Sequence, residues 1–315
     1  MISSIPSATT CPPRMQPKMN VAIAGVSNGL GHWIALALLS NPRFSVTLLT
    51  RTKSNDALES LITKGAILKV VDYGSSTSLA GALSGIHTVI STVWIHNNIV
   101  PMRSLLQAAV AAGVKRFAPS EFSFSAAANV DLIPYHVKVE LWKEVQKSGL
   151  EYTAFRNGLF MDYMAAGSSV PYPGLLTLHP YILDVKARRA EIPGTGDERM
   201  SFTTQEDVGR FVAAAVALDK WPEEMGMEGE TTTWNRIVEE AEKVVGERFT
   251  VSYVSREQLK ERLKDIPEDN WMGRFVTAGN LAIIDGKAAV IPYLNEATDV
   301  KPTNVSTFLN KYWGS

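Results

Sequence analysis

A glycine-rich turn is the first part of the chain whose residue types could do chemistry. Its glycines follow the short apolar run 21–24 and precede a helical pattern. Glycine permits a tight turn and lets backbone N–H groups approach a pyrophosphate at the positive end of the following helix. We therefore expect this turn to bind the phosphates of a dinucleotide. The candidate residues are Gly25, Ser27, Asn28, Gly29, Leu30 and Gly31.

The same turn also fits the G-x-S-x-G nucleophile elbow of α/β-hydrolases, with Ser27 as the nucleophile. That elbow normally follows several earlier strands, whereas this turn follows the first apolar run of the chain. The histidines and acidic residues show no pattern typical of a catalytic triad. A hydrolase is therefore the weaker alternative, and Ser27 is expected to bind phosphate or the turn itself.

Two cations follow the second apolar run, which covers residues 44–49. Arg51 and Lys53 stand where an NAD-preferring site carries an acidic residue for the ribose 2′-hydroxyl. No Asp or Glu occurs between His32 and Asn55. Because a guanidinium can bind phosphate through two hydrogen bonds, the pattern favours the 2′-phosphate of NADPH. The alternative is a pair of solvated loop cations.

Residues that follow the third and fourth apolar runs are placed near a cofactor by topology. Asp72 and Tyr73 fit the edge of the adenine, and Ser91, Thr92 and Val93 fit the wall along the cofactor. Packing at the ends of the strands is the alternative for both groups.

A lysine on a later helix could supply a proton. Val137, Leu141 and Val145 keep helical spacing and should face the core, which leaves Lys138 at the boundary of that apolar stripe. None of the nine tyrosines has a lysine four residues later, so the Tyr-x-x-x-Lys pair of the short-chain dehydrogenases is absent. Burial beside a positively charged nicotinamide would lower the pKa of Lys138 toward neutrality. A surface lysine on an amphipathic helix is the alternative.

Charge and histidine spacing argue against other classes of function. The formal net charge is −1, without the basic excess of a nucleic-acid binder. No apolar run is long enough to span a membrane. The only cysteine is Cys11, which is consistent with a cytoplasmic protein. The histidines lack the spacing of metal ligands, so no metal site is expected: His32, His87, His96, His136 and His179.

Alternating strand-like and helix-like segments must position these residues. The expected strands are 21–24, 44–49, 67–71, 88–93, 114–118 and 151–155, and the expected helices are 30–40, 56–64, 77–83, 100–112 and 133–147. The strands are apolar throughout, as in a parallel sheet covered on both faces. The pattern predicts an α/β fold, a Rossmann-type doubly wound parallel sheet.

The regular alternation ends near Gly158, which suggests a division into parts. We expect a disordered tail over 1–19 and an NADP-binding domain over 20–157, to which a helix at 204–218 returns. Segments 158–203 and 219–315 are expected to form a smaller α+β portion that binds the substrate. Its expected elements are 232–245, 249–254, 257–263 and 307–312.

Several segments together resemble the NmrA-like family, with the closest likeness to its isoflavone reductase and phenylcoumaran benzylic ether reductase branch, which are atypical short-chain dehydrogenases. They are the glycine turn, Val89-Ile-Ser-Thr92, Ala111-Ala-Gly-Val-Lys-Arg-Phe-Ala-Pro-Ser-Glu-Phe122 and Lys138. The resemblance covers roughly residues 20–310. It implies NADPH-dependent reduction, with Lys138 as the catalytic group and Phe160 packed against the nicotinamide.

Two positions depart from the family pattern. Asn28 stands where the family's middle glycine is expected, and Trp94-Ile-His96 follows the fourth strand where plant reductases tend to carry small residues. A bulky aromatic side chain there would reshape the pocket, so the plant substrates are not carried over. Phe122 and Tyr163 join Trp94 and His96 as candidate substrate-binding residues.

The sequence therefore predicts a monomeric or homodimeric reductase that acts on a small molecule. It would transfer hydride from NADPH to a carbonyl, a conjugated C=C or a benzylic carbon of an apolar aromatic or polyketide-like metabolite. A regulatory protein that senses NADP(H) without consuming it is the main alternative, because NmrA itself resembles this fold. Lys138 favours the enzyme.

Overall fold

A six-stranded parallel sheet forms the first half of the computed structural model, which describes residues 18–27, 29–53, 55–94, 98–124 and 136–314. Its strands are β1 (Met19–Ala24), β2 (Phe44–Thr50), β3 (Ile67–Val70), β4 (Thr88–Ser91), β5 (Arg116–Ala118) and β6 (Glu151–Tyr152). The strand order is β3-β2-β1-β4-β5-β6, and every neighbouring pair is parallel. The predicted Rossmann-type sheet is confirmed.

The register brings the carboxyl ends of the central strands to one edge. Ala24 pairs with Ser91, and Ile90 pairs with Ala118. The segments that leave β1, β4 and β5 therefore emerge side by side. This edge is where open α/β sheets bind their ligands, because the strand order reverses between β1 and β4.

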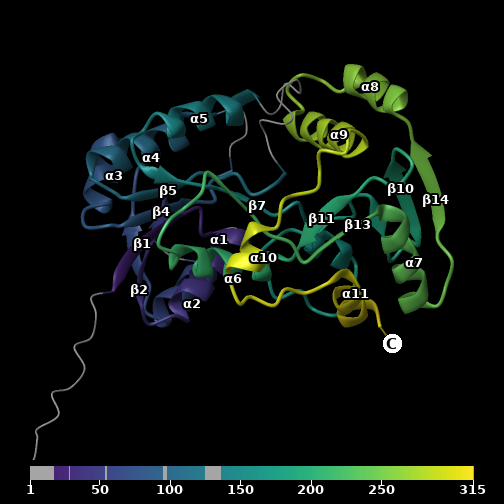
Figure 1. Cartoon of the computed structure of the whole chain (residues 1–315), viewed down its shortest axis with the longest axis horizontal. Coiled ribbons are helices and arrows are strands. Elements are labelled where there is room, and N and C mark those ends of the chain that lie inside the picture. Colours follow the sequence, from purple (N-terminus) through teal and green to yellow (C-terminus); the bar gives the residue numbers. More distant parts are fainter. Residues whose placement is uncertain (1–17, 28, 54, 95–97, 125–135, 315) are drawn as a thin grey trace, which may run out of the picture.

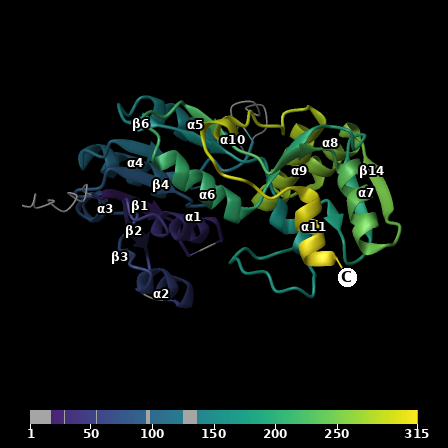
Figure 2. The same ribbon diagram turned by 60° about the horizontal axis from the view of Figure 1, so that its bottom comes forward.

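Helices cover both faces of this sheet (Figures 1 and 2). One layer contains α1 (Gly29–Leu39), α2 (Asp56–Thr63) and α6 (Gln205–Val216), and the other contains α3 (Ser76–Ala82), α4 (Val100–Ala111) and α5 (His136–Gln146). Coverage on both faces explains why the last four residues of β1 and all of β4 are buried.

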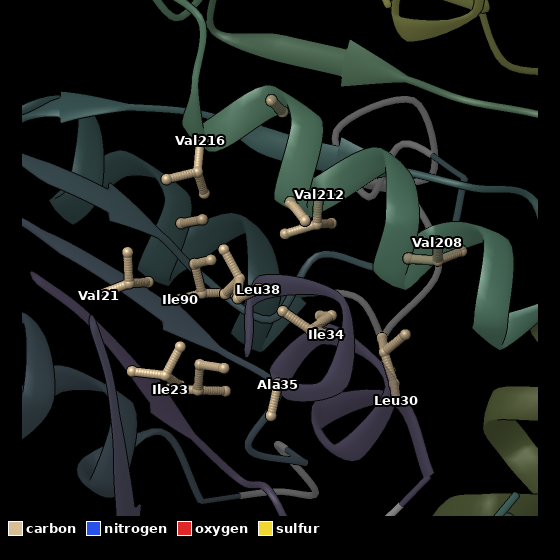
Figure 3. Packing of buried hydrophobic residues seen from close by; sticks show 14 of the residues in the cluster. Val21, Ile23, Leu30, Ile34, Ala35, Leu38, Ile90, Val208, Val212 and Val216 are labelled. Atoms are coloured by element: carbon tan, nitrogen blue, oxygen red, sulfur yellow. The ribbon is translucent and has the colours of Figure 1, made fainter. Parts of the chain in front are cut away.

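Helices α1 and α6 pack directly against each other although about 170 positions separate them in the sequence. Figure 3 shows Leu30, Ile34 and Leu38 of α1 on the side that faces Val208, Val212 and Val216 of α6. Spacing by four residues places each set on one helix face. A Cβ atom on Gly209 would lie 2.7 Å from the Trp33 carbonyl oxygen, so glycine permits this close approach.

The rest of the described chain forms small sheets and further helices. Its strands and 3₁₀ helix are β7 (Ala154–Arg156), β8 (Leu159–Phe160), η3 (Met161–Ala165), β9 (Leu183–Asp184), β10 (Arg189–Pro193), β11 (Met200–Thr203), β12 (Glu224–Gly226), β13 (Glu230–Thr232) and β14 (Thr250–Val254). The α-helices are α7 (Trp234–Val245), α8 (Arg256–Asp265), α9 (Trp271–Ile284), α10 (Tyr293–Ala297) and α11 (Val305–Trp313). The small sheets have the orders β14-β10-β9, β13-β11-β8 and β12-β7.

Local sequence explains the boundaries of α7, a helix of this second portion. Thr233 caps its amino end by accepting a hydrogen bond from the Arg236 N–H, and Gly246 ends it in the left-handed conformation at φ 77°. Its buried face includes Trp234, Ile237 and Ala241, which are three or four positions apart. This face packs into a second hydrophobic core, separate from the one under α1 and α6.

Some boundaries differ from the sequence-based expectation. Strand β1 starts at Met19, one residue inside the expected tail, whose residues 1–17 lie outside the described part of the chain. The expected strand 151–155 is divided between β6 of the large sheet and β7, which pairs with β12. Among the described residues, no helix is long and apolar enough to cross a membrane.

Candidate cofactor and proton-donor site

The glycine turn is held against the end of β4. The Thr92 hydroxyl donates to the carbonyl oxygens of Ala24 and Gly25, at 3.0 and 2.9 Å. Gly25 has φ 88°, and a Cβ atom there would lie 2.7 Å from the Thr92 carbonyl carbon. A Cβ atom on Gly31 would lie 2.6 Å from both the Gly25 carbonyl oxygen and Thr92 Oγ1. Glycine is therefore required at both positions for the turn to pack against β4.

A buried polar network supports the turn from α6. The Gln205 side chain covers Gly29, because a Cβ atom on Gly29 would lie 2.5 Å from Gln205 Oε1. The backbone N–H of Gln205 donates to Asp162 Oδ2 at 2.9 Å, and the Tyr172 hydroxyl donates to Asp162 Oδ1 at 2.6 Å. Burial raises the pKa of Asp162 to about 6, against the lowering effect of the hydrogen bond from Tyr172. Sequence reasoning missed Asp162 and Gln205.

The cations that follow β2 are exposed at the same edge of the sheet. Arg51 and Lys53 are both exposed. The Tyr73 hydroxyl donates to the Leu49 carbonyl oxygen at 3.3 Å, which brings the loop after β3 next to the end of β2. Burial raises the pKa of Tyr73, while the nearby charge of Arg51 lowers it. Asp72 is exposed and accepts a hydrogen bond from the Gly74 N–H at 2.8 Å.

Lys138 lies at the start of α5 with its amino group turned toward the end of β5. Its Nζ donates to the Ser120 carbonyl oxygen at 3.0 Å and lies 3.7 Å from Glu121 Oε1. The side chain is only 14% exposed. Burial lowers the pKa of Lys138, Glu121 raises it, and Arg156 lowers it. Val137 packs into the core while Leu141 and Val145 are buried, as the helical spacing predicted.

An arginine completes a line of buried charges behind Lys138. Arg156 Nη1 donates to Glu121 Oε2 at 2.5 Å, and the side chains of Arg156 and Glu121 are 4% and 2% exposed. On its other side, Arg156 Nη2 lies 2.8 Å from Oε1 of the half-exposed Glu224. Glu121 stands in a segment that carried the family resemblance and Arg156 ends β7, but sequence reasoning gave neither residue a role. The available signal was a charged residue at the end of an otherwise apolar strand.

Aromatic side chains gather beyond the end of β4. The Trp94 ring meets Trp271 of α9 edge to face, with the ring centroids 5.8 Å apart, and it lies 6.2 Å from Phe275. Trp271 and Phe275 are stacked at 4.8 Å. Trp94 is 47% exposed. These three residues, called here the aromatic cluster, join the edge of the large sheet to the second portion of the chain.

Sequence comparison shows the family to which this chain belongs. Residues 17–305 match the model of the NmrA-like family. The chain belongs to the NmrA-like family. Oxidoreductase BOA1 of Botryotinia fuckeliana is 30% identical over 239 residues, which cover 73% of this chain and 77% of that protein.

Solved structures share the NmrA-like fold over nearly the whole chain. AtPrR2 with NADP⁺ and (+)-pinoresinol has a TM-score of 0.77 at 20% identity and covers 95% of this chain and 100% of its own. The Escherichia coli NADPH-dependent quinone oxidoreductase, complexed with NADPH, has a TM-score of 0.73 at 20% identity, with coverages of 92% and 98%. Both likenesses confirm the predicted fold.

Within this NmrA-like chain, most of the predicted site residues lie along the carboxyl edge of the sheet. Phe122 and Phe160 pack against the core cluster that also contains Val26 and Leu30. The exposed Ser27 lies in the turn itself, and no histidine of the described chain hydrogen-bonds its hydroxyl. Asn28 and His96 lie outside the described residues.

Other predicted residues of the NmrA-like chain turn away from this edge. Leu30, Ser91 and Val93 direct their side chains into the protein: Leu30 and Ser91 are buried, and Val93 packs against a core cluster. Only the backbone at these positions is available to a ligand. Tyr163 is half-buried in η3, with its ring 5.1 Å from that of His179, and lies among the residues of the second portion. The described residues include no group of three or more His, Cys, Asp or Glu side chains that could hold a metal ion.

Proposed function

We propose that this protein is an NADPH-dependent reductase in which Lys138 supplies the proton. One observation carries the proposal: a buried lysine, with a buried counter-charge, lies at the carboxyl edge of a Rossmann-type sheet whose first strand leads into a glycine turn. A relative named as an oxidoreductase, and NADP(H) in solved structures of the same fold, support the proposal.

The residues of the turn fit a dinucleotide. Gly25 and Gly31 let the turn pack closely against the end of β4, and this packing sets the start of α1, whose first backbone N–H groups would bind a pyrophosphate. Gln205 Oε1 is buried beside this turn without a hydrogen-bond partner in the described chain, so an acceptor stands ready for a hydroxyl or amide of the cofactor. Exposed Arg51 and Lys53 would hold the 2′-phosphate.

The reduction divides between the cofactor and this chain. NADPH, when bound, supplies a hydride. Lys138 holds a proton at Nζ and gives it to the acceptor atom, or polarises the acceptor oxygen through an N–H hydrogen bond. The family resemblance assigns Phe160 to the ring that carries the hydride, and Phe160 is half-buried against the core cluster that contains Leu30.

The aromatic cluster supports a substrate with an apolar aromatic or polyketide-like body. Indole and phenyl rings favour the binding of flat apolar molecules. The reason is that a contact between two aromatic rings is more favourable in free energy than burial of the same apolar area alone. Acceptors of this kind carry a carbonyl, a conjugated C=C or a benzylic carbon. The Escherichia coli relative is named a quinone oxidoreductase, and AtPrR2 holds pinoresinol. A monomeric or homodimeric state and a cytoplasmic location stay predictions.

The alternative is a regulator that binds NADP(H) without consuming it. Oxidation of NADPH distinguishes the reductase from the regulator. Purified protein is mixed with NADPH and with one acceptor at a time, which is a quinone, an enone or an aromatic ketone. The absorbance of NADPH is then followed. A reductase oxidises NADPH with at least one acceptor class, and NADH serves less well. Tight NADPH binding without oxidation by any of these acceptors would favour the regulator.

A further inference from the structure

Three charged side chains from three different elements meet behind the proposed proton donor. Lys138 comes from α5, Glu121 from the segment after β5, and Arg156 from β7. All three are largely buried. Burying charges is costly even when they are paired, because desolvation can exceed the attraction between them, so stability alone does not explain this arrangement.

The two carboxylate oxygens of Glu121 face different partners. Oε2 is bound to Arg156 Nη1 at 2.5 Å, so its position is fixed. Oε1 is buried, has no hydrogen-bond partner in the described chain, and lies 3.7 Å from Lys138 Nζ. At that distance the carboxylate attracts the ammonium ion without taking one of its N–H groups. The Ser120 carbonyl oxygen takes one N–H at 3.0 Å, which leaves the others for a ligand.

We infer that Glu121 is a positioning residue that holds the Lys138 amino group at the carboxyl edge and keeps it protonated until the proton is donated. Arg156 in turn fixes the Glu121 carboxylate. This inference rests on the proposed function, since it assigns Glu121 a task toward the proposed proton donor. Nothing in the contacts requires Glu121 to touch the substrate or the cofactor.

The step balances in protons and electrons. Hydride from NADPH brings two electrons and forms the new C–H bond, and the acceptor takes a proton from Lys138 Nζ as the N–H bond breaks. Lys138 becomes a neutral amine and regains a proton from water. Among the described residues, the charges that act on Lys138 are those of Glu121 and Arg156, and Glu224 lies on the other side of Arg156.

These charges act on the lysine with opposite signs. Burial lowers the pKa of Lys138 most, Glu121 raises it, and Arg156 lowers it again. Removing the Glu121 charge therefore leaves burial and Arg156 unopposed, so the amine should lose its proton at lower pH. Glu224 provides a matched control, because it is a second carboxylate bound to the same arginine but does not contact Lys138.

The test measures the titration of Lys138 in the apo protein and needs neither coenzyme nor substrate. Acetic anhydride modifies only the neutral amine, and mass spectrometry of the Lys138 peptide across a pH series gives the midpoint. Lys143, exposed on the same helix, reports the amount of reagent in each sample. We expect Glu121→Gln to move the midpoint down by about one to two pH units. Glu224→Gln should have the same Lys138 midpoint as the wild type.

Each outcome decides the inference. An unmoved midpoint in Glu121→Gln, or an equal shift in Glu224→Gln, would overturn it. Should Glu121→Gln fail to fold, Glu121→Asp retains the charge one methylene further away, and we expect a smaller shift in the same direction; no shift there would also overturn the inference. The titration midpoint of Lys138 is measured without NADPH oxidation. A wild-type protein that reduces no acceptor would therefore contradict the proposed function and leave the role of Glu121 untouched.

Discussion

The Thr92 hydroxyl lies 2.9 Å from the Gly25 carbonyl oxygen and ties the end of β4 to the turn after β1. Its second hydrogen bond, to the Ala24 carbonyl oxygen, fixes the last residue of β1 as well. The turn is therefore set by its neighbour strand and not by its glycines alone. Thr92 was expected to line the cofactor; its buried hydroxyl instead supports the backbone that would hold the phosphates.

Adding a methyl group at Gly31 should disturb this turn. The new Cβ atom would lie 2.6 Å from both Thr92 Oγ1 and the Gly25 carbonyl oxygen, so the backbone must shift. We expect Gly31→Ala to lose about 1–3 kcal/mol of unfolding free energy and to bind NADPH at least about tenfold more weakly. Urea denaturation and fluorescence titration measure the two effects. Gly81→Ala in α3, where a Cβ atom meets nothing within 4 Å, should be neutral or slightly stabilising.

Reversing the charge at Arg51 should change the choice of coenzyme. A carboxylate there repels a 2′-phosphate and can accept from a ribose 2′-hydroxyl. We expect Arg51→Glu to weaken NADPH binding by roughly tenfold or more, on the scale of a lost charge-assisted hydrogen bond, and to spare NADH. Arg43→Glu makes the same change at the exposed opposite end of β2 and should alter neither affinity. Unchanged preference in Arg51→Glu would reject the assignment.

Truncation of Trp271 should weaken substrate binding more than the chemical step. Trp271 stacks on Phe275 and meets the edge of Trp94, so its loss opens the aromatic cluster. With an aromatic acceptor, Trp271→Ala should raise KM by roughly tenfold and leave kcat within a few fold. Met272→Ala removes an exposed neighbour on α9 and is the control. An equal effect in both variants would place the cluster outside the substrate site.

Asp162 should make the stability of the protein depend on pH. Burial raises the pKa of this carboxyl from 3.8 to about 6. Between these values the folded chain retains a proton that the unfolded chain has released, so stability falls as pH rises. From pH 4.5 to 7 the wild type should lose about 2 kcal/mol relative to Asp162→Asn, by urea denaturation at each pH.

A second variant checks the cause of this pH dependence. The Tyr172 hydroxyl donates to Asp162 and lowers its pKa. Tyr172→Phe removes that donor, so the pH-dependent loss of stability should become larger than in the wild type. Equal slopes in Asp162→Asn and the wild type would mean that other groups cause the effect.

The features that depend on local chemistry were predictable from the sequence. A turn that needs φ 88° at Gly25 and close packing at Gly31 requires glycine whatever the rest of the fold does. The spacing of Leu141 and Val145 placed the buried face of α5, and with it the boundary position of Lys138. The parallel sheet was predictable as well, because continuous apolar strands that alternate with helices are a pattern of the local sequence.

Contacts between distant segments were not predictable in this way. Glu121 and Arg156 are 35 positions apart, and the segment after β5 meets the end of β7 through a parallel bridge between Ser123 and Arg156. Helix α9 was missed, because its sequence contains two glycines and β-branched residues that lower local helical propensity. Packing of its face, including Ala278 and Ala282, stabilises it instead. With α9 the sequence analysis also missed Trp271 and Phe275.

Single-turnover hydride transfer tests the central claim most directly. Wild type, Lys138→Ala and the control Lys143→Ala are saturated with NADPH, mixed with an acceptor that the wild type reduces, and followed by stopped flow. We predict that Lys138→Ala binds NADPH as the wild type does but transfers hydride about 10²- to 10⁴-fold more slowly, while Lys143→Ala matches the wild type. Transfer at the wild-type rate in Lys138→Ala would contradict the account.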